Sequence, residues 1–405
     1  MIELSEQGVT LGMIASEAVA MMTSKALGEK RVGAFVEGLF GEDLHAKRVL
    51  SLTHATLGAT RAGALGIHAI GQGLALARGV SRRHSVKQVD RFLGNTGISP
   101  WELLSSWVPF AVGSREEIVV ALDWTDFDAD GQCTIAAHLV TNHGRATPLA
   151  WLTVEKEGLK DCRSLWEDTV LQRLRETLPA TVKRVIILGD RAFGDTKLYA
   201  LLAELKFDFV IRFREIISVE AADGESRSAG EWVGKSGRAK KLAGAKVTGN
   251  GMPVPAVVCV HAKGMKEAWC LASSLSEATA TEIVKLYGRR FTIEESFRDL
   301  KDLRFGMGLS WVRVSTVERR DKLLLVSALA VALLTLLGAA GEAVGIDRHF
   351  KTNTSPKRQH SLFRQGCMYY EFLPTMCDEW TRALIEKFAE LMSAQEALRA
   401  TFGLI

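Results

Sequence analysis

The stretch from Glu117 to Glu155, EIVVALDWTDFDADGQCTIAAHLVTNHGRATPLAWLTVE, decides the fold class of this chain. It contains three short runs rich in Ile, Val, Thr and aromatic residues, at 117–123, 133–141 and 146–155. Turn-forming residues separate the runs, first Asp-Gly and then Asn-His-Gly. Short β-type runs divided by polar turns predict an antiparallel meander of three strands.

Helices and strands alternate after the meander. Residues 165–177 and 196–205 have helical patterns, whereas 184–189 (RVIILG) and 207–213 (FDFVIRF) read as buried strands. Strands joined through helices are usually parallel neighbours. The sequence therefore predicts an α/β fold with a mixed sheet.

Length and composition limit the class of protein. The chain has 405 residues, enough for two to three domains, and its composition is that of a globular protein. The net charge of +4 is too mild to identify a nucleic-acid partner by itself. None of the six cysteines is in CxxC spacing, and no secretory leader opens the chain, so we expect free thiols and a cytoplasmic protein.

We predict three parts. Residues 1–112 form a helical N-terminal domain, and 113–345 form the α/β core. Glycines and short β-like runs predict a β-rich insertion within that core at about 215–276. Residues 346–405 hold a basic segment around Pro356 and a C-terminal helix; a DNA-backbone contact, a dimer contact and a solvated loop are the alternatives for this segment.

A basic stretch lies near the end of the N-terminal part. Residues 78–91 contain five Lys or Arg residues and one acidic residue. Ser85 with Gln88 three residues later forms a capping-box pattern, which predicts that a helix begins there. Lys87 and Arg91 would share one face of that helix, either against DNA or as an ordinary solvated surface.

One apolar segment raises the alternative of a membrane span. Leu323 to Ala340 carries no charge over its length, and a spanning helix needs roughly 20 apolar residues. Charged residues flank it closely, and it lacks an aromatic belt. We favour a helix buried in a large core and expect no membrane association.

Two carboxylates directly follow apolar strands. Asp123 ends EIVVALD, and Asp190 ends RVIILGD. Side chains at the carboxyl ends of strands meet at the site crevice of an open α/β sheet. Two carboxylates there would repel each other unless divalent cations such as Mg²⁺ or Mn²⁺ neutralise them. The alternative for each residue is an ordinary turn or helix N-cap aspartate.

A third carboxylate lies on a predicted helix over Lys285–Leu303, KLYGRRFTIEESFRDLKDL. Tyr287, Glu294 and Lys301 are spaced two turns apart, which predicts a common face, with Arg290 close beside it. A carboxylate can hold a metal while guanidinium and ammonium groups grip phosphates. The alternative is a solvated face with an i,i+4 pair between Arg290 and Glu294.

These residues resemble a known family. Tyr287-x2-Arg290-x3-Glu294-x6-Lys301 matches the Y-R-E-K signature of a group of bacterial insertion-sequence transposases, the hairpin-forming cut-and-paste type of DDE transposase. The words ALDWTD, LGDRAFGD and FTIEESFRDLK also resemble that group, and the likeness covers roughly residues 80 to 365. The resemblance implies a ribonuclease-H-like core with a β-strand insertion, preceded by a helical DNA-end-binding domain and followed by helices.

The resemblance also implies a chemistry. Asp123, Asp190 and Glu294 would be the DDE triad, holding two Mg²⁺ ions, with Mn²⁺ as a substitute. Such enzymes nick one strand at the transposon end, form a hairpin, reopen it and join the end to target DNA. The implied partners are terminal inverted repeats and target DNA, bound by a homodimer at the nucleoid. A metal-dependent nuclease without strand transfer and an inactive DNA-binding relative are the alternatives.

Further DNA contacts follow from the same resemblance. Tyr287, Arg290 and Lys301 would hold phosphates, the first two near a flipped base. Phe291 stands where relatives often have a stacking Trp. Trp269 lies where relatives carry a base-displacing aromatic, although a core anchor is an equal alternative. Arg212, placed just past the last core strand, is either a DNA contact or simply exposed.

Overall fold

The computed structural model describes residues 27–352, 354 and 358–393. By its internal contacts the chain forms two compact units. We call Val112–Thr141 with Arg145–Ser296 the sheet unit, and the remainder the helical unit. The three-part division predicted from the sequence, at 112/113 and 345/346, remains a prediction.

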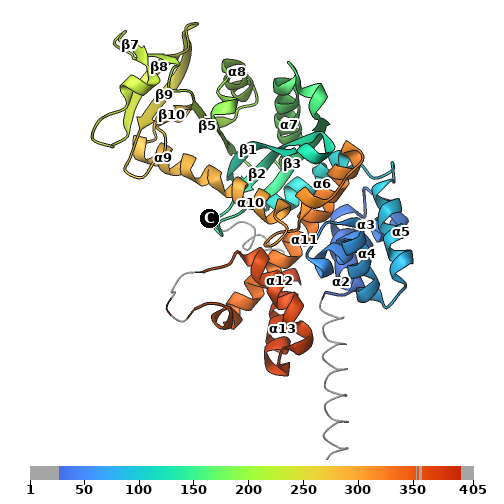
Figure 1. The fold of residues 1–405 in the computed structure, drawn as a ribbon. Coiled ribbons are helices and arrows are strands. Elements are labelled where there is room, and N and C mark those ends of the chain that lie inside the picture. Colours follow the sequence, from blue (N-terminus) through green and yellow to red (C-terminus); the bar gives the residue numbers. More distant parts are fainter. Residues whose placement is uncertain (1–26, 353, 355–357, 394–405) are drawn as a thin grey trace, which may run out of the picture. The chain divides into compact units, whose positions relative to one another are not determined.

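One sheet of ten strands runs through the sheet unit, in the order β3-β2-β1-β4-β5-β10-β9-β8-β6-β7 (Figure 1). Its core half comprises β1 (Glu117–Phe127), β2 (Gln132–Val140), β3 (Ala146–Glu155), β4 (Arg184–Gly189) and β5 (Asp208–Phe213). β1, β2 and β3 pair antiparallel, whereas β4 and β5 run parallel to β1. The predicted meander and the parallel strands after it are both confirmed.

Helices explain why these strands are so apolar. α7 (Arg163–Thr177) packs on β2 and β3, and α8 (Thr196–Glu204) packs on β5. β2 is buried along its whole length, and β4 is buried at every residue except its first. Strands covered on both faces read as continuous apolar runs, as these do. The fold class predicted from the sequence is confirmed.

The predicted insertion extends the same sheet. It contributes β6 (Ser218–Glu220), β7 (Ser226–Ser228), β8 (Lys240–Val247), β9 (Met252–Val260) and β10 (Trp269–Ser273). β10 pairs antiparallel with β5, so the insertion strands continue the core sheet instead of forming a separate one. The chain then enters α9 (Ala280–Gly288) and α10 (Thr292–Lys301).

The helical unit is built around one long helix, α11 (Val317–Ala343). The other helices of this unit are α2 (Glu29–Phe40), α3 (Ala46–Ala62), α4 (Ile67–Arg78), α5 (Arg82–Leu93), α6 (Pro100–Val112), α12 (Leu362–Phe372) and α13 (Asp378–Ser393). α11 is long and apolar enough to span a membrane, but 89% of its most apolar window is buried inside the protein. The burial is what we expect of a core helix.

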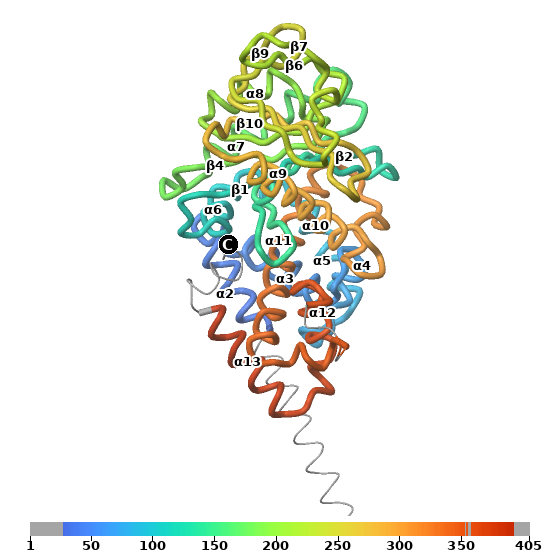
Figure 2. Tube along the Cα trace, turned by 90° about the vertical axis from the view of Figure 1, so that its left-hand side faces the viewer, coloured from blue at the N-terminus to red at the C-terminus, as the bar shows by residue number. Residues whose placement is uncertain are grey.

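Two glycines let α12 lie against α11 (Figure 2). A Cβ at Gly366 would come within 1.8 Å of the Leu334 carbonyl oxygen, and one at Gly338 within 2.0 Å of the Leu362 carbonyl oxygen. Backbone contacts this close leave no room for any side chain. The small residues in the apolar segment therefore serve helix packing.

α5 begins earlier than the capping-box pattern predicted. Its first residue is Arg82 and its N-cap is Ser81, so the predicted start at Ser85 is wrong. Ser85 is buried, and its hydroxyl donates to the Ser81 carbonyl oxygen at 3.2 Å. A serine that bonds back to the carbonyl four residues earlier is already inside a helix.

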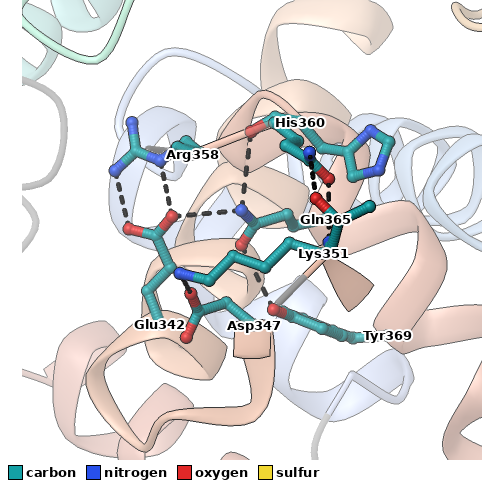
Figure 3. Close-up of polar contacts among 9 residues, drawn as sticks. Glu342, Asp347, Lys351, Arg358, His360, Gln365 and Tyr369 are labelled. Carbon is teal, nitrogen blue, oxygen red and sulfur yellow. Dashed lines mark hydrogen bonds and ion pairs between the residues drawn. The ribbon is translucent and has the colours of Figure 1, made fainter. Parts of the chain in front are cut away.

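Polar contacts tie the segment after α11 to its neighbours (Figure 3). Arg358 donates to both carboxylate oxygens of Glu342, at 2.5 and 2.6 Å, and Gln365 donates to the same carboxylate at 3.0 Å. Lys351 pairs with Asp347 at 3.0 Å. Two cations of the predicted basic segment are thus used within the protein, while Pro356 lies outside the described residues.

A buried histidine links four helices of the helical unit. His54 on α3 is 2% exposed, and its Nε2 lies 2.7 Å from a carboxylate oxygen of Glu29 on α2. The Gln88 amide nitrogen on α5 lies 2.6 Å from His54 Nδ1, and Arg78 on α4 donates to Glu29 at 2.8 Å. Because an amide nitrogen only donates, Nδ1 accepts, and the neutral ring donates from Nε2 to Glu29.

We expect the stability of this unit to fall as pH falls below about 6.5, the ordinary pKa of histidine. Burial lowers the pKa of His54, with the Arg78 charge acting in the same direction and Glu29 opposing it. The folded state therefore binds fewer protons than the unfolded state, and stability rises with pH across this window. Thermal unfolding at about pH 5.5 and 7.5 measures this slope.

Two variants test the assignment. His54→Ala should lower the free energy of unfolding at neutral pH by about 2–3 kcal/mol, since it removes a buried ring together with its hydrogen bonds to Glu29 and Gln88. It should also flatten the slope with pH. His68→Ala, at an exposed histidine on α4, should change neither quantity. An unchanged slope in His54→Ala would assign the pH dependence to another group.

Candidate active site

Asp123 and Asp190 come to the same edge of the sheet by strand register. The last pair between β1 and β4 is Leu122 with Gly189, so each aspartate is the next residue along its chain. β1 does not end at Asp123 as predicted, because β2 keeps β1 paired as far as Phe127. Asp123 therefore lies within a strand, at the point where β4 leaves its side.

Asp190 also has a local role. It is the N-cap of a short 3₁₀ turn, Arg191–Phe193, and its Oδ1 accepts the Ala192 N–H at 2.8 Å. Asp190 is therefore a turn aspartate, as the alternative interpretation held, but this role uses only one of its two carboxylate oxygens. The carboxylate is half-buried at the carboxyl end of β4, the edge where side chains of a parallel sheet gather.

The predicted helix over Lys285–Leu303 is not continuous. A 3₁₀ turn, Arg289–Phe291, separates α9 from α10, which ends at Lys301. Gly288 weakens the helix at this point, and a 3₁₀ turn winds the chain more tightly than an α-helix. The continuous helix predicted there is therefore wrong, and its side chains differ in exposure: Tyr287 is 1% exposed, whereas the Glu294 side chain is 47% exposed.

The turn carries Arg290 into the space between two of the carboxylates. Its Nη2 donates to Glu294 Oε1 at 2.5 Å, and its Nη1 donates to Asp123 Oδ2 at 3.3 Å. The i,i+4 pair weighed as the alternative is present. It is not a solvated surface pair, however, because Arg290 is 5% exposed and also reaches Asp123 on another element.

The pKa of Asp123 is shifted by burial and by the charges around it. Burial raises this pKa from 3.8 to about 6. The Arg290 guanidinium opposes the rise, whereas the negative charges of Asp190 and Glu294 add to it. A carboxylate that responds to two others and to one guanidinium shares a site with all of them. The structure therefore places Asp190 and Glu294 close enough to Asp123 to act on its charge, and Arg290 binds Asp123 and Glu294.

Three aromatic rings lie beside Arg290. The Trp269 ring on β10 is 4.9 Å from the Tyr287 ring, edge to face, and 6.0 Å from the Phe291 ring, both measured between centroids. The Arg290 guanidinium carbon is 4.9 Å from the Phe291 centroid. Phe291 is 42% exposed and Trp269 is half-buried, so Trp269 is not fully enclosed in the core.

Arg212 lies inside β5, opposite Leu271, and not past the end of the last core strand as predicted. Its side chain is 17% exposed. It donates from Nη2 to Glu267 Oε2 at 2.7 Å and to the Ala268 carbonyl oxygen at 2.9 Å. A second arginine, Arg191, donates to the same Glu267 oxygen at 3.2 Å and was not predicted from the sequence. Its position directly after Asp190 in LGDRAFGD was the available signal.

Residues 114–333 match the family described as the transposase DDE domain, a match that spans more than half of the chain and includes all three carboxylates. The chain belongs to this DDE transposase family. Its mixed sheet with flanking helices is a ribonuclease-H-like transposase fold. No curated protein matches the chain.

DDE transposases generally use divalent metal ions and bind DNA ends. Among the residues that the structure describes, no group of three or more His, Cys, Asp and Glu side chains stands ready to hold a metal ion. The Arg290 guanidinium lies instead between Asp123 and Glu294. Three carboxylates are nonetheless a donor set that suits Mg²⁺ or Mn²⁺.

The remaining predicted DNA contacts lie in the helical unit. Lys87 and Arg91 are exposed on α5, one turn apart. Lys301 is the last residue of α10 and is half-buried. The other predicted contacts, Tyr287, Arg290, Phe291, Trp269 and Arg212, belong to the sheet unit with the carboxylates.

Proposed function

We propose that this transposase cuts an insertion sequence out at its own terminal inverted repeats and joins the freed 3′ ends to target DNA. The observation that supports the proposal is the pairing of Asp123 and Glu294 through Arg290, with the charge of Asp190 acting on Asp123. They come from β1, the end of β4 and α10, all within the segment that matches the family.

The three carboxylates would hold two Mg²⁺ ions, for which Mn²⁺ can substitute. When bound, such a pair of ions activates water or a 3′-hydroxyl and stabilises the charge on the phosphodiester that is attacked. Asp123 and Glu294 would then no longer need Arg290 to balance their charge. The freed guanidinium is suited to a phosphate oxygen, which it can bind through two parallel N–H donors.

We infer the hairpin route from the Y-R-E-K residues. Hairpin formation requires a base to leave the stack, and aromatic rings stabilise such a base. The exposed Phe291 ring beside Arg290 supports this step, since it offers a stacking surface next to a phosphate-binding group. Trp269 would displace the base, while Tyr287 and Lys301 would hold its phosphates.

The proposed partners are double-stranded transposon ends and target DNA. Lys87 and Arg91 would contact the backbone of an end, because both are exposed cations on one helix face. We further propose a homodimer on paired ends at the bacterial nucleoid, in the cytoplasm, with residues 346–405 in the dimer contact.

Cleavage and joining can be tested together. The full chain, incubated with Mg²⁺ and labelled DNA from the sequence that flanks its gene, should give a nicked strand, then a hairpin, then a product joined to a target plasmid. The hairpin runs as a single strand of doubled length on a denaturing gel. Cleavage without any joined product would support the nuclease alternative, and a complete lack of cleavage would contradict the proposal.

A further inference from the structure

Two arginines near the carboxylates converge on a single carboxylate oxygen. Arg191 follows Asp190, Arg212 lies in β5, and Glu267 lies in the loop between β9 and β10. Glu267 Oε2 accepts from Arg191 Nη1 at 3.2 Å and from Arg212 Nη2 at 2.7 Å. A pair of guanidinium groups that point at the same anionic oxygen is suited to binding a phosphate.

The two sides of this contact differ in how firmly they are held. Arg212 is 17% exposed and also donates to the Ala268 backbone, so its guanidinium is fixed in place. Its buried Nε–H meets no acceptor within the described ranges, so the guanidinium retains an unused donor. Glu267 is 51% exposed on a loop, and exposed ion pairs are weak. The carboxylate can therefore leave while Arg212 stays, and the exposed Arg191 side chain can turn to whichever anion occupies the site.

The arginine pair belongs to the same neighbourhood as the carboxylates. Burial raises the pKa of Tyr287, the positive charges of Arg290 and Arg212 lower it, and the charge of Asp190 raises it further. Arg212 therefore acts on the same phenol as Arg290 and Asp190. Arg191 is joined to Asp190 by one peptide bond, and all of these residues lie in the sheet unit.

We propose that Arg191 and Arg212 form a binding site for a DNA backbone phosphate, and that Glu267 occupies this site until a phosphate displaces it. This rests on the proposed function, in which DNA is the substrate. DNA held by few other contacts would compete poorly with an internal carboxylate, whereas an end bound by the rest of the protein would displace it. Glu267 thus lowers the affinity of every DNA that uses this site, so that DNA held by few other contacts stays unbound at concentrations where an end is bound.

The test measures binding of a labelled duplex to the full chain by fluorescence anisotropy, without divalent metal so that no strand is cut. Glu267→Gln should tighten binding by about 3- to 5-fold, because it removes a competitor comparable to a surface ion pair. Glu220→Gln is the matched control: Glu220 is an exposed carboxylate of the same insertion, paired with Lys246 at 2.9 Å. It should change the affinity by less than about 2-fold.

A second background shows whether the arginines carry the effect. In Arg212→Gln, or in Arg191→Gln if the first variant does not fold, adding Glu267→Gln should bring no further gain in affinity. Equal gains in Glu267→Gln and Glu220→Gln, or a gain that survives loss of the arginine, would overturn the proposal. Wild-type binding without a gain in Glu267→Gln overturns the displacement alone, whereas no binding by either protein overturns the proposed function as well.

Discussion

Glu294→Gln is expected to slow Mg²⁺-dependent DNA cleavage by about 10³-fold or more. The amide keeps the shape of the side chain but removes one of three negative charges that would hold the metal ions. Metal ions contribute several kcal/mol of transition-state stabilisation, and each 1.36 kcal/mol is worth about tenfold in rate. The measurement is the single-turnover rate of strand nicking on labelled end DNA.

The neighbouring residue provides a matched control. Glu295 lies on the same helix and pairs with Arg145 at 3.6 Å instead of Arg290. Glu295→Gln should therefore change the cleavage rate by less than about 3-fold. Binding of end DNA by Glu294→Gln should persist, since its defect lies in the chemical step. Equal cleavage by wild type and Glu294→Gln would show that Glu294 is not a metal ligand.

Much of the core sheet could be predicted from local pattern. Apolar runs of strand length, bounded by turn residues, located β2, β3, β4 and β5 to within a few residues. The helices between strands predicted their parallel order, since a crossover connection permits little else. The same reasoning predicted that Asp123 and Asp190 would lie at one edge, and each is the residue after the last pair between β1 and β4.

The errors have a common physical cause, which is pairing and packing over long distances. The sequence around Asp123 does not indicate that pairing with β2 continues β1 as far as Phe127. The break between α9 and α10 likewise accompanies the burial of Arg290 against Asp123, a residue 167 positions away. Periodicity alone could not show that Tyr287 turns inward while Glu294 stays accessible.

The contacts of Arg191 and Arg212 with Glu267 could not be predicted from the sequence for a related reason. Arg191 and Glu267 are 76 residues apart, and Arg212 and Glu267 are 55 apart. Spacing within one helix can suggest an i,i+4 pair. The loop that carries Glu267 is brought to Arg212 only by the pairing of β10 with β5, which spacing does not reveal. Arg290 balances the charge of carboxylates that metal ions would balance in the proposed complex. Glu267 likewise balances the charge of arginines that a phosphate would balance.

Asp123→Asn is expected to stabilise the folded protein at about pH 8 while removing catalysis. Burial raises the pKa of Asp123 from 3.8 to about 6, so the folded state disfavours the ionised form. The stability associated with the protonated form is fully present below about pH 4 and is lost as pH rises through about 6. At 1.36 kcal/mol per unit, the ionised carboxylate costs at most about 3 kcal/mol at pH 8, and asparagine avoids that cost.

Thermal unfolding with and without Mg²⁺ separates this electrostatic effect from a change in packing. Because Mg²⁺ would bind the proposed site only in the folded protein, it should raise the unfolding temperature of the wild type and leave that of Asp123→Asn unchanged. Asp126→Asn is the control: it lies on the same strand, exposed and paired with Lys156 at 2.9 Å, and it should keep the response to Mg²⁺. Near pH 4, where the wild-type Asp123 is protonated, Asp123→Asn and the wild type should have similar stability. A variant less stable than the wild type at pH 8, or one that still responds to Mg²⁺, would exclude Asp123 as a strained metal ligand.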